Sequence, residues 1–134
     1  MLKYMLDTNI AIYIIKRRPL ELLTTFNKHA GQLSISSITL AELLHGVEKS
    51  AKPEHNLQQV EDFVSRLDVL PYAEKAASHY GDIRAQLERK GNAIGVNDLH
   101  IAGHARSEAL ILVTNNQREF DRVPGLRVEN WLQA

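Results

Sequence analysis

The 134-residue chain contains no cysteine. This absence excludes a disulfide framework, a zinc–thiolate site and a thiol nucleophile, and it makes a reducing compartment the simplest setting. Long hydrophobic runs are also missing: the longest apolar run covers only residues 10–15, far short of the roughly 18 residues that a membrane helix needs. Asp7 interrupts the apolar start, which argues against a signal peptide. We therefore expect a cytoplasmic protein that does not associate with membranes.

Neither sign of charge is in excess, because 16 Lys and Arg balance 16 Asp and Glu. Composition alone therefore does not indicate a nucleic-acid-binding protein. If four carboxylates gathered in one metal site, the remaining surface would carry 16 basic against 12 acidic residues, which is compatible with a polyanionic substrate. The length and the hydrophobic fraction of 44% are typical of one globular domain, residues 1–134.

Short apolar segments alternate with helical segments along the chain. Strands are expected at residues 2–6, 33–37, 69–70, 110–113 and 126–129, and helices at 8–18, 20–28, 38–49, 54–67, 73–90 and 98–107. This order predicts an α/β fold with a mainly parallel central sheet flanked by helices on both faces. In such sheets ligands gather outside the carboxyl ends of the strands, so polar residues directly after a strand are the first candidates for chemistry.

Two acids fit this position in the first third of the chain. Asp7 directly follows the first strand, although Asp is also a favoured helix N-cap. Glu42 lies in the helix after the second strand, on a side shared with Thr39, His45 and Lys49 at helical spacing. A solvated face or a weak pair with Lys49 would explain Glu42 equally well. Neither acid is informative alone.

Asp98 is the more informative acid. It shares a helical stripe with Ile101, Ala102 and Ala105, small apolar residues that are expected to pack inward. The alternative is placement in the first turn, where the helix dipole favours a carboxylate. Asn97 is expected to cap this helix.

A third polar cluster follows the strand predicted at residues 110–113. Thr114, Asn116 and Glu119 stand at the exit of this strand, where their oxygen atoms can converge with Asp7. The alternative is a polar turn in which Glu119 is an ordinary surface acid.

Convergent carboxylates need a counter-charge. Two unit charges about 5 Å apart repel by roughly 3 kcal/mol at an effective dielectric constant near 20, so such acids protonate or bind a cation. Acid and amide ligands without any thiolate favour Mg²⁺ or Mn²⁺ over zinc. Such an ion orients a phosphodiester and activates a water, so phosphodiester hydrolysis is the reaction expected.

At this point the sequence resembles the PIN domains, and within them the VapC-type toxin ribonucleases of bacterial type II toxin–antitoxin pairs. The resemblance covers nearly the whole chain and rests on these segments: residues 5–9, 35–43 with Gly46, 97–105, 112–116, 118–120 and 125–131. It implies a three-layer α/β/α fold and a Mg²⁺- or Mn²⁺-dependent endoribonuclease, in which a water activated by the metal attacks the phosphate.

By this resemblance, Asp7, Glu42 and Asp98 correspond to the acidic triad of the family. The resemblance implies that these three residues are metal ligands and catalytic residues. A fourth acid is expected after residue 113. Position 116 is Asn where many relatives have Asp, so we assign the fourth carboxylate to Glu119 and make Asn116 an amide ligand or water orienter. Thr8 and Thr114 are expected to hold the carboxylates in place.

The resemblance also implies partners. Members of the family are homodimers silenced by a VapB antitoxin, whose C-terminal segment lies across a groove of the toxin, and the complex binds promoter DNA through the antitoxin. Their substrate is RNA, frequently tRNA, and this chain looks most like the enteric group that attacks the anticodon loop of initiator tRNA.

The apolar residues of the two predicted helices at 8–18 and 20–28, including Leu23 and Phe26, are candidates for a groove, a dimer surface or the core. The candidate RNA contacts are Arg17, Arg18, Arg84 and Arg118.

Other interpretations remain. His100 and His104 have the spacing of a zinc pair but lack the acid between them that a metalloprotease has, so we expect packing or surface roles. A phosphoacceptor receiver domain fits poorly, because the predicted third strand runs into Pro71 and Tyr72. A PIN-like module that only binds a partner, and a PIN nuclease acting on other RNA or single-stranded DNA, stay open as alternatives.

Overall fold

The computed structural model describes residues 1–132, so the last two residues of the predicted domain lie outside the described part of the chain. The strands are β1 (Tyr4–Leu6), β2 (Leu33–Ser36), β3 (Asp68–Leu70), β4 (Ile111–Val113) and β5 (Val128–Glu129). The helices are α1 (Thr8–Ile15), α2 (Leu20–Lys28), α3 (Ser37–Glu48), α4 (Pro53–Val64), α5 (Glu74–Arg89), α6 (Val96–Ser107) and α7 (Gln117–Phe120). No helix among residues 1–132 has both the length and the apolarity to cross a bilayer.

The five strands form one sheet in the order β3-β2-β1-β4-β5. Every neighbouring pair is parallel, which confirms the predicted kind of sheet. In the central strand β1, Met5 lies opposite Ser34 on one side and Leu112 on the other. Because the strands all point the same way, the residues that follow β1, β2 and β4 emerge at one edge of the sheet.

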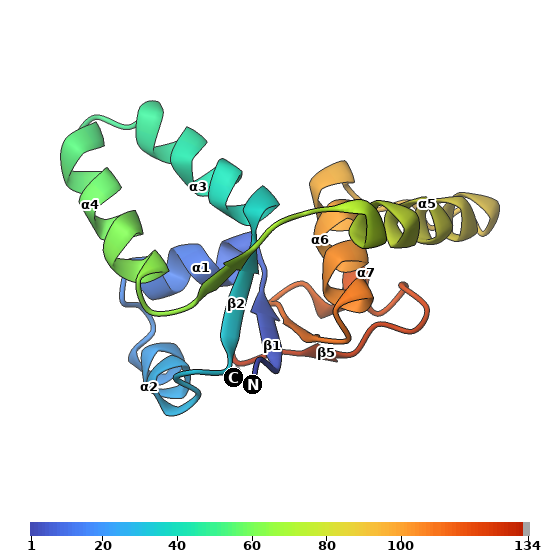
Figure 1. Ribbon diagram of the computed structural model, residues 1–134, viewed down its shortest axis with the longest axis horizontal. Coiled ribbons are helices and arrows are strands. Elements are labelled where there is room, and N and C mark those ends of the chain that lie inside the picture. The colour runs from blue at the N-terminus through green and yellow to red at the C-terminus, as the bar shows by residue number, and fades with distance from the viewer. Residues whose placement is uncertain (133–134) are drawn as a thin grey trace.

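Helices cover both faces of this sheet, α1–α4 on one face and α5–α7 on the other (Figure 1). Alternate side chains of β1 point to opposite faces, as in any strand. Tyr4 and Leu6 therefore pack in one core with Phe26, whereas Met5 packs in the other core with Ile83. The architecture is the expected three-layer α/β/α arrangement.

Helix α6 is fixed against both α5 and the sheet. At Gly103, a Cβ atom would lie 2.9 Å from the backbone nitrogen of Tyr80, so glycine is what allows the two helices to approach this closely. The buried ring of His104 is hydrogen-bonded through Nδ1 to Oγ of Ser36, at 2.8 Å, at the end of β2. These contacts hold the start of α6, which carries Asp98, next to the carboxyl edge of the sheet.

Two local predictions were wrong, and one helix was not predicted. Helix α6 begins at Val96 with Gly95 as its N-cap, so Asn97 lies inside the helix and does not cap it. Residues 117–120, for which a polar turn was the alternative, form the one-turn helix α7, which is too short to show a helical period in the sequence. Helix α1 ends at Ile15 rather than near residue 18, because Arg17 takes a positive φ of 58° that no helix continues through.

Candidate active site

Asp7 sits at the centre of the carboxyl edge, directly after β1. Its backbone N–H donates to the carbonyl of Val113 in β4 at 3.0 Å, and its Oδ1 accepts the N–H of Ile10 at 2.9 Å. Asp7 is thus the N-cap of α1 as well as a candidate ligand. Burial raises the pKa of Asp7, and the charge of Glu42 adds to this, whereas hydrogen bonds from Thr114 and Ile10 act in the opposite direction.

Glu42 reaches the same place from α3. Its Oε1 accepts a hydrogen bond from the Thr8 hydroxyl at 2.5 Å, and its Oε2 accepts one from the Asn97 amide at 2.9 Å. The Thr8 hydroxyl also lies 3.1 Å from that of the buried Thr39. The described ion pairs include none between Glu42 and Lys49. Glu42 therefore faces the acids rather than a surface cation.

Asp98 lies in the first turn of α6, and it is half-buried. The apolar stripe on its side of the helix is buried as predicted: Ile101, Ala102 and Ala105. Burial raises the pKa of Asp98 to about 6, with further contributions from the charges of Glu119, Asp7 and Glu42 and from a hydrogen bond with Glu119. Asp98 is therefore the acid on which the other three act electrostatically.

The segment after β4 completes the cluster. The buried Thr114 accepts the backbone N–H of Asn116 through its Oγ1 at 2.8 Å, which turns the chain into α7. The Asn116 side-chain amide then donates to Oε2 of Glu119 at 2.6 Å. Asn116 thus orients Glu119, and Glu119 is the carboxylate of this segment that meets Asp98.

The cluster combines four acids from four separate segments of the chain. Among residues 1–132, no three acidic or histidine side chains already stand in a closed ligand cage. The donor set nevertheless fits a hard divalent cation, because all donors are oxygens, and burial together with the repulsion between the acids favours the protonated form of Asp98 when no cation is bound. The residues that could hold Mg²⁺ or Mn²⁺ are Asp7, Glu42, Asp98 and Glu119.

Sequence reasoning missed Asn97 as a member of this site. It was interpreted as a helix cap, yet its side chain bridges to Glu42, 55 residues earlier in the chain. No sequence signal separates the two roles, because an Asn near a helix start suits either.

The hydrogen bonds of the two histidines of α6 are made to residues other than the four acids. His104 binds Ser36 in the interior, whereas Nδ1 of His100 lies 2.7 Å from the Tyr72 hydroxyl and its ring stacks on Tyr80 at 4.1 Å. Both histidines have the packing roles that we expected.

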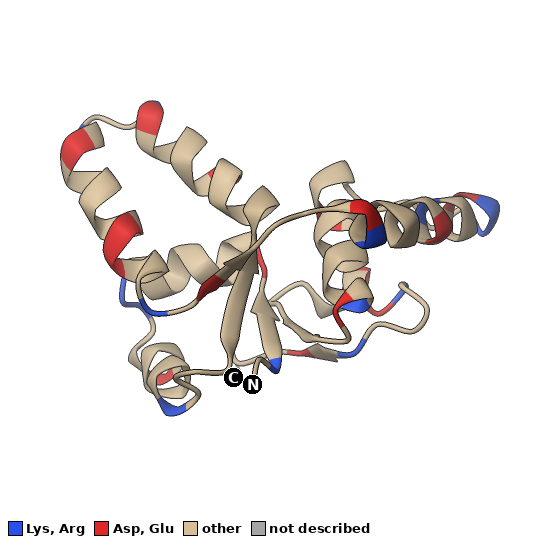
Figure 2. Cartoon of the chain, in the orientation of Figure 1, with Lys and Arg blue, Asp and Glu red and all other residues tan. Residues whose placement is uncertain are grey.

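The four candidate RNA-contacting arginines are dispersed. Arg17 and Arg18 follow the far end of α1, whose eight residues span about 12 Å, so they stand away from Asp7. Arg84 binds Glu88 and the hydroxyl of Tyr80 on α5, and Arg118 is exposed on α7 beside Glu119. Figure 2 likewise shows basic and acidic segments on both helical layers.

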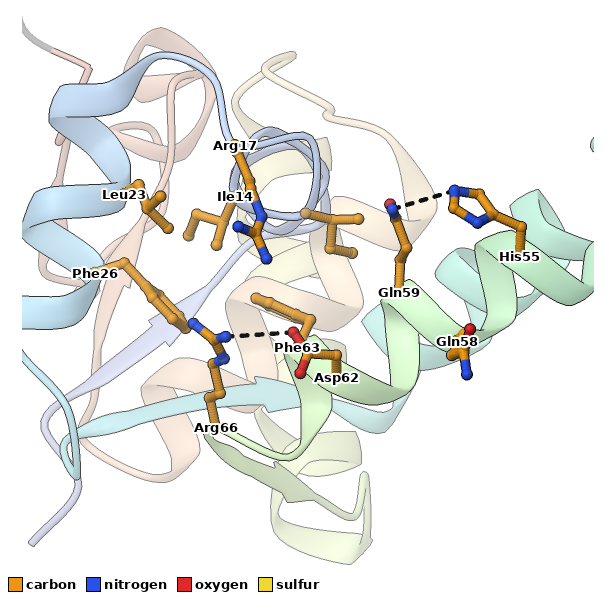
Figure 3. Close-up of a pocket in the computed structure, with 11 residues that line it drawn as sticks. Ile14, Arg17, Leu23, Phe26, His55, Gln58, Gln59, Asp62, Phe63 and Arg66 are labelled. Carbon is orange, nitrogen blue, oxygen red and sulfur yellow. Dashed lines mark hydrogen bonds and ion pairs between the residues drawn. The ribbon is translucent and has the colours of Figure 1, made fainter.

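A groove of about 390 Å³ lies between α1, α2 and α4, separate from the acid cluster. Its apolar lining includes Leu23 and Phe26, two of the early-helix residues considered above, together with Phe63. Figure 3 shows Arg17 and Arg66 directed toward this groove, with Arg66 paired to Asp62 at 3.4 Å. The early-helix apolar residues therefore serve both the core and a surface groove.

Comparison with known proteins gives consistent results. Residues 4–126 match the PIN domain family. The chain is 62% identical to Ribonuclease VapC2 of Haemophilus influenzae, over 98% of this chain and 100% of that protein, and 57% identical to the tRNA(fMet)-specific endonuclease VapC of Shigella flexneri, over 98% and 99%. The crystal structure of DNA-bound VapBC from Salmonella typhimurium superposes with a TM-score of 0.94 at 55% identity, over 98% and 99% of the two chains. The chain therefore belongs to the PIN domain family, within its VapC ribonuclease branch.

Proposed function

We propose that this chain is the toxin of a type II toxin–antitoxin pair, a Mg²⁺- or Mn²⁺-dependent endoribonuclease that cuts tRNA in the cytoplasm and so inhibits translation. The observation that carries this proposal is the convergence of three other carboxylates on Asp98, whose pKa is raised to about 6, first by burial and then by the charges of these three acids. Such crowding of like charge is unfavourable unless a cation occupies the cluster.

Hydrogen bonds hold three of the acids, Asp7, Glu42 and Glu119, in position for this role. When bound, the ion would orient the phosphodiester and supply a hydroxide-like water at neutral pH. The Asp7 carboxylate accepts hydrogen bonds from the Ile10 amide and from Thr114, which fix its orientation beside the cluster. Glu42 and Glu119 are each held by a neutral amide donor, Asn97 and Asn116 respectively, which leaves their negative charge undiminished.

The proposed substrate is tRNA, with initiator tRNA cut in its anticodon loop as the specific form. The relative from Shigella flexneri is named a tRNA(fMet)-specific endonuclease and shares 57% of its residues with this chain. If the four acids hold an ion, the remaining surface carries a basic surplus, which favours the approach of a polyanion. Arg118, exposed beside Glu119, is the predicted phosphate contact nearest the acids.

The decisive experiment is sequencing of RNA ends after brief expression in cells, paired with cleavage of purified initiator and elongator methionine tRNAs. We expect one dominant cut in initiator tRNA that disappears with EDTA and with the Asp7→Asn variant. Cleavage of single-stranded DNA in place of RNA, or tRNA binding without cleavage by folded wild-type protein, would contradict the proposal and favour the two alternatives.

We further propose that the α1–α2–α4 groove receives a C-terminal segment of a VapB-type antitoxin, and that the complex of toxin dimers contacts promoter DNA only through that antitoxin. The related Salmonella typhimurium structure is of a DNA-bound VapBC. The groove offers an apolar floor around Phe26 and Phe63 with charged side chains at its rim, which suits an amphipathic segment.

Filling the groove tests this docking site. Gln59→Trp, on its α4 wall, is expected to weaken binding of purified antitoxin at least tenfold while RNA cleavage continues. Glu61→Trp is the matched control, because residue 61 is exposed and does not line the groove. Equal antitoxin affinity of both variants would show that the antitoxin binds elsewhere.

A further inference from the structure

Both oxygens of the Glu42 carboxylate are held by donors from other parts of the chain. Thr8 donates to Oε1 at 2.5 Å, and the side-chain amide of Asn97 donates to Oε2 at 2.9 Å. Because an ionised carboxylate only accepts hydrogen bonds, the NH₂ group of Asn97, and not its carbonyl oxygen, must face Glu42. The contact therefore has a defined direction.

The two donors stand next to the other acids of the cluster. Thr8 follows Asp7 in the chain, and Asn97 precedes Asp98. Glu42 lies on the half-exposed side of α3, and a Glu side chain there has three rotatable bonds with which to turn toward solvent. With one oxygen tied beside Asp7 and the other beside Asp98, that freedom is removed.

Nothing else in the described structure explains the Asn97 side chain. Gly95, not Asn97, is the N-cap of α6, and the Asn97 residue is exposed. Within residues 1–132, the bond to Glu42 is the one hydrogen bond that its side chain makes. Shortening this side chain therefore leaves the helix, its cap and the core intact.

A neutral amide is also the donor that suits a cation site. A lysine or arginine at this position would hold Glu42 equally well, but its charge would cancel part of the negative potential that attracts a metal ion. An amide fixes the carboxylate and leaves its charge available.

We propose that Asn97 is a positioning residue of the nuclease, which holds the Glu42 carboxylate in the orientation needed to complete the cation site. This inference rests on the proposed function. Residues that orient metal ligands change metal affinity or activity by roughly 10–100-fold when they are removed.

The test compares Asn97→Ala with Asn97→Gln, which restores the amide on a longer stem, and with Asn92→Ala, which removes an exposed amide from the loop before α6. Mn²⁺ affinity is measured by electron paramagnetic resonance titration, and stability by thermal unfolding in EDTA. Activity is measured as tRNA cleavage over a range of Mn²⁺ concentrations. We expect Asn97→Ala to weaken Mn²⁺ binding about tenfold or more and to lower kcat/KM at low Mn²⁺, with kcat recovering at saturating Mn²⁺. Asn97→Gln should recover most of the affinity, Asn92→Ala should match the wild type, and all should unfold at the same temperature.

A double variant separates positioning from a general effect on the site. In the Glu42→Gln background, Asn97→Ala should cause no further loss of Mn²⁺ affinity, because the group that it positions is already gone. Wild-type Mn²⁺ affinity and kcat/KM in Asn97→Ala, alongside impaired Glu42→Gln, would overturn this inference alone. A wild-type protein that neither binds Mn²⁺ nor cuts RNA would overturn the proposed function, and this inference with it.

Discussion

Replacing Asp98 with Asn is expected to stabilise the cation-free protein at neutral pH while abolishing RNA cleavage. Asn keeps the shape of the side chain and can still donate a hydrogen bond to Glu119, as protonated Asp98 does. It removes the one charge on which the three other acids act. Stability and activity should therefore move in opposite directions.

The size of the effect follows from the pKa of Asp98, which lies near 6 in the folded protein against an ordinary value of 3.8. At 1.36 kcal/mol per pKa unit, ionised Asp98 costs the folded state about 3 kcal/mol at neutral pH. Screening by solvent at this half-buried side chain and the attraction of the α6 N-terminus reduce this to about 1–2 kcal/mol. For a chain of this length we expect an unfolding temperature about 3–6 °C higher.

The higher stability of Asp98→Asn relative to the wild type must depend on pH in one direction. Above pH 6 the folded wild type carries the full penalty, because Asp98 is ionised in both the folded and the unfolded chain. As the pH falls through 6 toward 4, folded Asp98 takes up a proton before unfolded Asp98 does, so the wild-type protein recovers this stability. The advantage of Asp98→Asn is therefore largest at pH 7–8 and shrinks as the pH falls.

Urea unfolding in EDTA at pH 5 and pH 8 measures this difference. Asp68→Asn is the matched control, because it removes an exposed carboxylate on the edge strand β3 and should show no such pH-dependent gain. If Asp98→Asn is less stable than the wild type at pH 8, or if its stability differs from that of the wild type by the same amount at both pH values, the reasoning from the burial and charge crowding of Asp98 is refuted.

Three further predictions concern the remaining parts of the site. Asp7→Asn should abolish cleavage and change stability by less than about 1 kcal/mol, because Asn also caps helices and the loss of a buried charge offsets weaker hydrogen bonds. Retained cleavage by this folded variant would falsify the site assignment. Glu119→Gln should reduce Mg²⁺-dependent cleavage more than Asn116→Ala does, and the reverse order in the same assay would move the fourth ligand to Asn116. Gly103→Ala should destabilise the protein by about 1–3 kcal/mol, measured by urea unfolding, since its Cβ would meet the Tyr80 backbone at 2.9 Å; unchanged stability would mean that α5 shifts freely.

The fold, and the meeting of the acids that the family resemblance singled out, could be predicted from the sequence for a physical reason. Short buried strands that alternate with helices permit few arrangements, and the carboxyl edge of a parallel sheet is where polar residues such as Asp7 must meet. The stripe that Asp98 shares with buried apolar residues pointed inward for the same reason, since helical periodicity fixes which residues share a face.

What could not be predicted depends on contacts between segments distant in the chain. The role of Asn97 follows from where α3 places Glu42, not from its own neighbours. The turn of α7 depends on a hydrogen bond from the Asn116 backbone to the Thr114 side chain, and the separation of Arg17 from the acids depends on where α1 ends. The residues that lie at the ends of the strands could therefore be predicted, whereas the side chains that they contact could not.

The central place of β1 has a consequence for biosynthesis. β1 is made first, but one of its two neighbours, β4, is made more than a hundred residues later. A growing chain emerges from the ribosome beginning at its N-terminus, so Asp7 and Glu42 are exposed long before Asp98 and Glu119 exist to join them. A growing chain therefore cannot assemble the complete set of four acids until residue 119 has been made and has emerged.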